Sequence, residues 1–98
     1  MDIKINAVNF TVDQKLVDHL TEKVSKLTLY FDQIISSEVF LRVDKNDEKE
    51  NKITEIKILI PGKELFAKKQ CKTFEEAGDL VVEALRKQIV KHKEKQLI

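Results

Sequence analysis

The chain has 98 residues, of which 42% are apolar and 36% are charged, and its formal net charge is +1. This length predicts one domain over residues 1–98, and the composition excludes a disordered chain and a membrane span of about 20 apolar residues. The small net charge argues against a polyanionic partner only if the charges are evenly distributed.

The first half of the chain predicts a strand, a long helix and a second strand. Apolar and polar residues alternate over residues 1–9, which is typical of a half-buried strand. Thr11 and Gln14 have the spacing of a capping box, which predicts a helix from about Val12 to about Tyr30. The buried stripe of this helix comprises Leu16, Leu20, Val24, Leu27 and Phe31. The second predicted strand follows residue 36 and turns Val39, Leu41 and Val43 to one face.

The second half predicts two more strands and a final helix. The polar run at residues 44–51 reads as a solvated hairpin loop, followed by a strand with inward Thr54, Ile56, Ile58 and Ile60. Pro61 and Gly62 predict a tight turn into a strand at residues 63–71. Thr73 and Glu76 form a second capping box, which opens the last helix.

The predicted element order is β-α-β-β-β-α. Two amphipathic helices can then cover one face of a four-stranded, mostly antiparallel sheet. The fold class is therefore α+β.

The bases of the chain are concentrated in two short segments. Residues 86–95 hold five bases and one acid, and residues 63–72 hold four bases and one acid, so the other 78 residues hold a net charge of −6. A helix dipole stabilises cations in the terminal turn only, so it does not account for bases over three turns. We expect the first half of the last helix to pack on the core and the second half to project beyond it. This pattern favours a polyanion contact over a merely solvated helix end.

Other surfaces carry weaker signals. Lys15, His19, Lys23 and Lys26 share the polar face of the first helix, which taken alone is an ordinary solvated face. Phe40 and Phe66 could stack bases on the outer face of the sheet, but an apolar cross-strand contact with Leu59 is the favoured interpretation.

The sequence offers little material for catalysis. His19 and His92 lie on charged helix faces, and Cys71 at the end of a strand reads as a small buried hydrophobe. We therefore predict a binding protein with no catalytic residue, no metal and no cofactor. A lone cysteine and the lack of a signal peptide at the start of the chain predict a reducing, cytoplasmic location.

Two segments resemble the ribosome hibernation promoting factor family, also called the ribosome-associated inhibitor family. One contains Lys26-Leu27, Tyr30-Phe31-Asp32-Gln33-Ile34 and residues 39–45, and the other is the finish at residues 88–95, with its Lys-His-Lys-acidic-Lys pattern. The length is similar to that of the short form of the family, which lacks a C-terminal dimerisation domain.

The resemblance implies a fold similar to double-stranded RNA-binding domains and a non-enzymatic function. Members of the family occupy the mRNA and tRNA channel of the small ribosomal subunit, near the decoding centre, and inhibit translation when growth slows. The resemblance and the charge pattern together give these candidate rRNA-binding residues: Lys23, Lys26, Lys45, Lys68, Arg86, Lys87, Lys91, His92, Lys93 and Lys95. Pairing of idle ribosomes would need a separate helper factor.

Two positions depart from the family pattern. Ala84 stands where members often carry a base, although Arg86 adds one nearby, and Gly78 stands where a large apolar residue is usual. Two other interpretations remain open: a general double-stranded RNA-binding module acting away from ribosomes, and a regulatory domain that binds a metabolite or itself through the outer sheet face.

Overall fold

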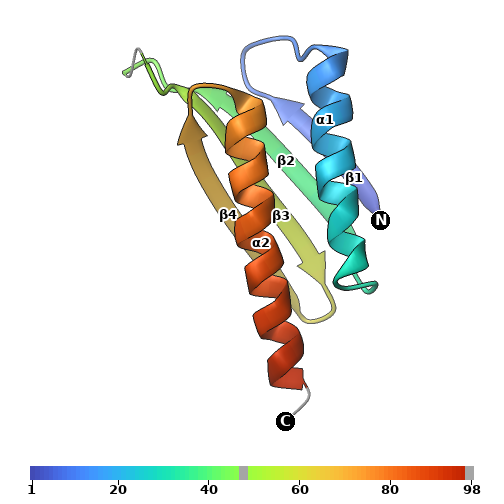
Figure 1. The fold of residues 1–98 in the computed structure, drawn as a ribbon. Coiled ribbons are helices and arrows are strands. Elements are labelled where there is room, and N and C mark those ends of the chain that lie inside the picture. Colours follow the sequence, from blue (N-terminus) through green and yellow to red (C-terminus); the bar gives the residue numbers. More distant parts are fainter. Residues whose placement is uncertain (47–48, 97–98) are drawn as a thin grey trace.

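The protein consists of one four-stranded sheet and two long helices (Figure 1). A computed structural model describes residues 1–46 and 49–96, so part of the predicted loop at residues 44–51 lies outside the described residues. The strands are β1 (Asp2–Ala7), β2 (Ser36–Val43), β3 (Lys52–Ile60) and β4 (Lys63–Cys71). The helical segments are α1 (Gln14–Ser25), a 3₁₀ turn η1 (Lys26–Leu29) and α2 (Phe74–Gln96).

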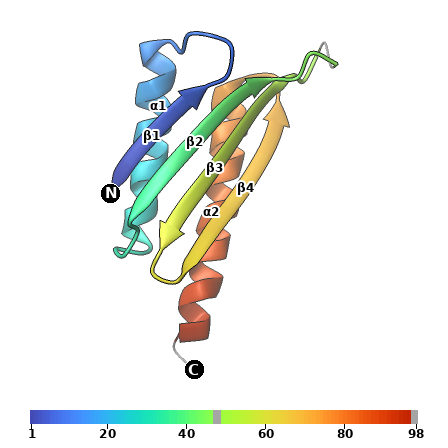
Figure 2. The same ribbon diagram turned by 180° about the vertical axis from the view of Figure 1, so that it is seen from behind.

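The strands lie side by side in the order β1-β2-β3-β4. β1 and β2 are parallel because α1 crosses over between them, whereas β2, β3 and β4 pair antiparallel through hairpin connections. Both helices cover the same face, and the other face is uncovered in Figure 2. The predicted α+β class and element order are confirmed.

The core lies between the helices and the inner face of the sheet. The inward residues of the predicted third strand, Thr54, Ile56, Ile58 and Ile60, are all buried. In β2 the buried residues are Ser37, Val39 and Leu41. The prediction had included Val43, which is exposed at the end of the strand, and had omitted Ser37. The helices contribute buried Leu16, Leu20, Val24, Leu27, Phe74, Ala77, Val81, Leu85 and Ile89. Burying each large apolar side chain contributes about 1.5–3 kcal/mol, so this interface holds both helices on the sheet.

The start of α1 differs from the sequence prediction. Asp13 is the N-cap, and its carboxylate accepts a hydrogen bond from the backbone N–H of Lys15 at 2.6 Å. The predicted capping box of Thr11 and Gln14 is therefore wrong, because Asp13 caps equally well and lies directly before the first helical residue.

The end of the first helix also differs. The α-helix stops at Ser25, and the predicted last turn is a 3₁₀ segment over Lys26–Leu29. The Ser25 hydroxyl donates to the Thr21 carbonyl at 2.6 Å, and the Thr28 hydroxyl donates to the Ser25 carbonyl at 2.7 Å. Side chains that bond backbone carbonyls in this way compete with regular helical pairing, which explains the tighter turn.

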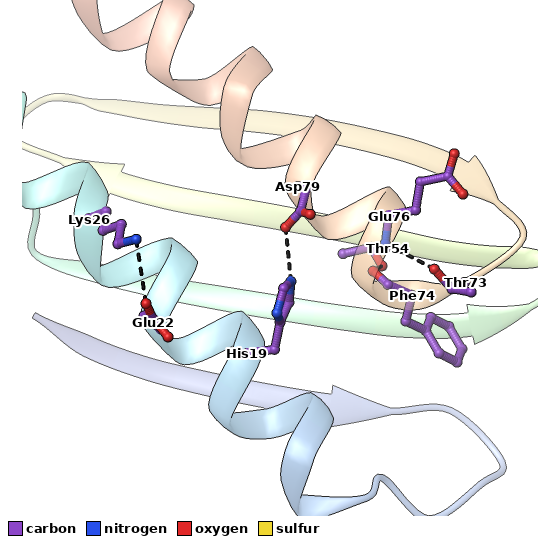
Figure 3. Close-up of polar contacts among 8 residues, drawn as sticks. All are labelled: His19, Glu22, Lys26, Thr54, Thr73, Phe74, Glu76 and Asp79. Atoms are coloured by element: carbon purple, nitrogen blue, oxygen red, sulfur yellow. Dashed lines mark hydrogen bonds and ion pairs between the residues drawn. The ribbon is translucent and has the colours of Figure 1, made fainter.

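The second half of the chain follows the prediction closely. β4 has the predicted bounds, and Gly62 in the preceding turn has a φ of 74°, a conformation that favours glycine. The Thr73 hydroxyl accepts a hydrogen bond from the backbone N–H of Glu76 at 3.1 Å, as the predicted cap of α2 requires (Figure 3). The buried Thr54 hydroxyl donates to the Phe74 carbonyl at 3.2 Å and ties β3 to the start of α2.

On the outer face of the sheet, neither Phe40 nor Phe66 lies directly opposite Leu59, which is instead a diagonal neighbour of Phe66. Phe40 lies opposite Glu55, and Phe66 lies opposite Lys57 rather than Leu59. The Lys57 ammonium lies 5.7 Å from the centre of the Phe40 ring, which is a cation–π distance. Charged residues therefore interrupt the aromatic residues on this face.

Candidate nucleic-acid interface

The two helices run in the same direction, toward the end of the sheet that carries the β3–β4 turn (Figure 1). This follows from the topology, since α1 returns from the end of β1 to the start of β2, and α2 returns along β4. Bases at both helix ends and after the turn therefore gather at one end of the molecule. This basic end comprises Lys23, Lys26, Lys63, Arg86, Lys87, Lys91, Lys93 and Lys95.

The last part of α2 extends beyond the sheet. Ile89 is 1% exposed and is the last core residue of the helix, whereas Lys91, Lys93 and Lys95 are exposed. Figures 1 and 2 both show the end of α2 past the β3–β4 turn. The predicted projection is confirmed, and it begins after Ile89.

A cleft of about 270 Å³ lies between the end of α2 and the start of β4. Lys63, Lys91 and Lys95 line it, and the Gln88 side chain donates to the Phe66 carbonyl at 3.0 Å on the same side of α2. Three cations from two elements thus converge on one concave surface that also includes Glu64, and the remaining net positive charge suits an anion such as a backbone phosphate.

His92 differs from its predicted place among the surface cations. Its ring packs edge-on against Phe31, with centroids 5.8 Å apart and an interplanar angle of 84°. Its Nε2 atom is buried without a hydrogen-bond partner, although the half-buried residue also lines the cleft beside β4. His92 therefore contributes mainly to packing near the C-terminal end of α2.

A second cleft, of about 180 Å³, lies between α1 and α2. We call it the interhelical cleft; it is lined by Lys23, Lys26, Leu27, Tyr30, Asp79, Val82, Glu83 and Arg86. His19 Nε2 and Asp79 Oδ1 are 2.9 Å apart and bridge the two helices (Figure 3). On the α1 side, Lys26 Nζ lies 3.4 Å from Glu22 Oε1.

Arg86 is held in the interhelical cleft by two neighbours. Its Nε atom donates to Glu83 Oε2 at 3.0 Å, its Nη2 atom contacts Glu83 Oε1, and the guanidinium lies 5.7 Å from the centre of the Tyr30 ring. The hydrogen bonds from Arg86 lower the pKa of the Glu83 carboxyl, and those to Glu83 raise the pKa of Arg86. The charge of Arg86 is thus already paired.

Two predicted site residues lie away from the basic end. Lys45 follows β2 at the opposite end of the sheet, beside Arg42 and Phe10. Lys68 lies across from Glu55 on the face that the helices leave uncovered, because Leu65 and Cys71 of the same strand point inward. The bases of residues 63–72 are therefore spread along β4 rather than gathered.

Sequence reasoning missed Lys63 and Tyr30 as site residues. Lys63 joins the basic end because the Pro61-Gly62 turn lies beside the end of α2, and only the three-dimensional arrangement shows this proximity. Tyr30 follows η1 and is 40% exposed, so it faces the interhelical cleft rather than continuing the buried stripe.

Comparison with known proteins identifies the family. Residues 3–97 match the family described as Sigma 54 modulation protein / S30EA ribosomal protein. The chain belongs to this family. It is 33% identical to a ribosome hibernation promoting factor of Azotobacter vinelandii over 97 residues, which cover 99% of this chain and 87% of that protein. The resemblance noted in the sequence is confirmed.

Two solved structures share the fold of the chain. A ribosomal subunit interface protein from Coxiella burnetii matches with a TM-score of 0.86 and 19% identity, covering 96% of this chain and 99% of that one. The N-terminal domain of Protein Y from Thermus thermophilus matches with a TM-score of 0.81 and 22% identity, covering 94% and 99%.

Two further features concern the described part of the chain. Neither α1 nor α2 has the length and the apolar character that crossing a membrane requires. Within residues 1–46 and 49–96, no three or more His, Cys, Asp or Glu side chains are grouped so that they could hold a metal ion.

Proposed function

We propose that the protein is a ribosome hibernation factor of the cytoplasm. Its basic end binds rRNA phosphates of the small ribosomal subunit near the decoding centre. The bound protein occupies the channel that mRNA and tRNA would use and so inhibits translation in slow growth or stress. Membership of the family and the names of its relatives support this proposal.

One observation carries the proposal: cations from three separate elements meet at one end of a chain whose net charge is +1. Clustered cations create a local positive potential that attracts a polyanion whatever the total charge is. Those of α2 also extend past the sheet, so they can reach into a groove between RNA helices.

The protein acts by occupancy rather than by chemistry. The Cys71 thiol is buried and its pKa is raised by burial, so it is a poor nucleophile. His19 is engaged with Asp79, and His92 packs against Phe31. Within residues 1–46 and 49–96, no thiol or hydroxyl is hydrogen-bonded to either histidine, so the nucleophile–base pair that nucleophilic catalysis requires is not formed there.

Cosedimentation with isolated small and large ribosomal subunits tests the proposal. The wild-type protein should pellet with small subunits, and the variant Lys87→Glu/Lys91→Glu/Lys95→Glu should not. A matched control, Lys49→Glu/Lys69→Glu/Lys72→Glu, makes the same change in net charge at the other end of the molecule, at three bases outside the predicted binding residues, and should retain binding. Equal loss in both variants would show that only the total charge matters.

Competition separates this function from that of a general duplex-binding module. A factor in the mRNA and tRNA channel should be displaced from small subunits by mRNA with initiator tRNA. Displacement by any long RNA duplex, with no effect of mRNA and tRNA, would favour a general double-stranded RNA-binding module.

A further inference from the structure

The interhelical cleft differs chemically from the rest of the basic end. Its interior includes apolar Leu27 and Val82, and its sides include the acids Asp79 and Glu83. Its three bases face two carboxylates and an apolar surface, so a phosphate gains less here than in the cleft beside β4, where three bases face Glu64 alone. A nucleobase instead offers a flat apolar face, and its N–H groups can donate hydrogen bonds to carboxylates.

Arg86 and Tyr30 lie against one another at one side of the interhelical cleft. Both oxygens of Glu83 contact Arg86, and the guanidinium lies over the Tyr30 ring, 5.7 Å from its centre. The side chain of Arg86 is 32% exposed, and Tyr30 is 40% exposed. Unpaired bases in RNA stack on aromatic rings and on guanidinium planes of this kind.

The remaining lining residues suit the backbone of the same nucleotide. Lys23 and Lys26 line the cleft from the α1 side, and Glu22 is the one ion-pair partner of Lys26 among the residues that the structure describes. Such an exposed ion pair contributes little, so Lys26 can turn to a phosphate at small cost. The bridge between His19 and Asp79 fixes the Asp79 carboxylate at the wall of the cleft.

We propose that the interhelical cleft binds one unpaired nucleobase of an RNA loop or bulge, stacked on the cation–π pair of Arg86 and Tyr30. Lys23 and Lys26 bind the phosphates that flank this nucleotide. The inference rests on the proposed function, because RNA is the partner. It changes the predicted contribution of Arg86, which offers a planar surface for a base rather than a free charge for a phosphate.

Substitutions at position 30 test the stacking contact in the small-subunit binding assay. Tyr30→Leu removes the ring and should weaken binding roughly 5- to 150-fold, which corresponds to the usual effect of losing one stacked base. Its salt dependence should stay that of the wild type, since no ionic contact is lost. Tyr30→Phe should regain the lost affinity. Leu29→Ala, next to the cleft on η1, changes an 80%-exposed side chain outside the cleft lining and is the matched control.

Arg86→Lys separates the planar surface from the charge. It keeps the cation but loses the guanidinium plane and the two-point contact with Glu83. We expect it to weaken binding about as much as Tyr30→Leu does, whereas a phosphate contact would tolerate lysine. Thermal unfolding of each variant shows that it is folded.

The outcomes distinguish this inference from the proposed function. Wild-type binding to small subunits with unchanged affinity in Tyr30→Leu would overturn the base pocket alone. Equal losses in Tyr30→Leu and Tyr30→Phe would also overturn it, because the hydroxyl rather than the ring would then matter. Absence of wild-type binding to small subunits would overturn both proposals.

Discussion

The side chain of Leu20 fills the space that a Cβ atom on Gly78 would occupy. An ideal Cβ at this position would lie 2.5 Å from Leu20 Cδ2, and Leu20 is fully buried in α1. The sequence indicated only that Gly78 stands where a large apolar residue is usual in the family. In the structure, the missing side chain lets α1 and α2 approach closely beside the bridge between His19 and Asp79.

Gly78→Ala should therefore not stabilise the protein. Alanine gains about 1 kcal/mol of helix propensity over glycine, while overpacking of a core typically costs about 1–3 kcal/mol. We expect a net loss of about 1 kcal/mol in the free energy of unfolding, measured by urea denaturation.

A double-mutant cycle checks the cause of this loss. Leu20→Ala alone should cost about 2–5 kcal/mol, and the loss in the double variant should be smaller than the sum of the two, because alanine at position 78 fills part of the cavity. Strict additivity would contradict the contact between the two residues.

The observed cap of α1 predicts unequal effects of two neighbouring substitutions. Asp13→Ala removes the acceptor of the Lys15 N–H and should lower the free energy of unfolding by about 1 kcal/mol. Thr11→Ala should change it by less than about 0.5 kcal/mol, as is usual for an exposed site without such a contact. If chemical denaturation showed a larger loss for Thr11→Ala than for Asp13→Ala, Thr11 would be the cap, as predicted from the sequence.

The Cys71 thiol should react slowly in the native protein. Burial raises its pKa above the ordinary value of 9.0, and the nearby carboxylates of Glu76 and Glu50 raise it further. Alkylation followed by mass spectrometry should be much slower for the native protein than for the same chain in urea. Equal rates in the two conditions would show that the thiol is exposed.

The same pKa shift predicts a loss of stability in alkaline solution. The folded state disfavours the thiolate, so the contribution of this group to stability is complete below the ordinary pKa of 9.0. It is lost as the pH rises through the higher pKa of the folded state. Urea denaturation of the wild type and of Cys71→Val between pH 7 and pH 11, about two units either side of that ordinary thiol pKa, should show a larger loss in the wild type than in the variant.

Much of the fold follows from local patterns in the sequence. The Pro61-Gly62 turn, the bounds of β4 and the Thr73 cap each depend on residues close together in the chain, and all three are confirmed. The 3₁₀ segment after Ser25 was not predicted, because side-chain bonds to backbone carbonyls leave no periodic signal.

The candidate site was less accessible to sequence reasoning. Charge counting found the bases of α2, but it also counted Lys68 on β4, which lies on the uncovered face. Two of the site's contacts join residues more than fifty positions apart: the ring contact of His92 with Phe31 and the cation–π contact of Arg86 with Tyr30. No local pattern in the sequence could reveal them.

The salt dependence of binding to small ribosomal subunits tests the central claim most directly. If about six cations of the basic end meet phosphates, the logarithm of the affinity should fall with the logarithm of the salt concentration with a slope of roughly −4 to −5. Lys87→Glu/Lys91→Glu/Lys95→Glu should reduce the slope together with the affinity. An association that salt does not weaken would contradict the account.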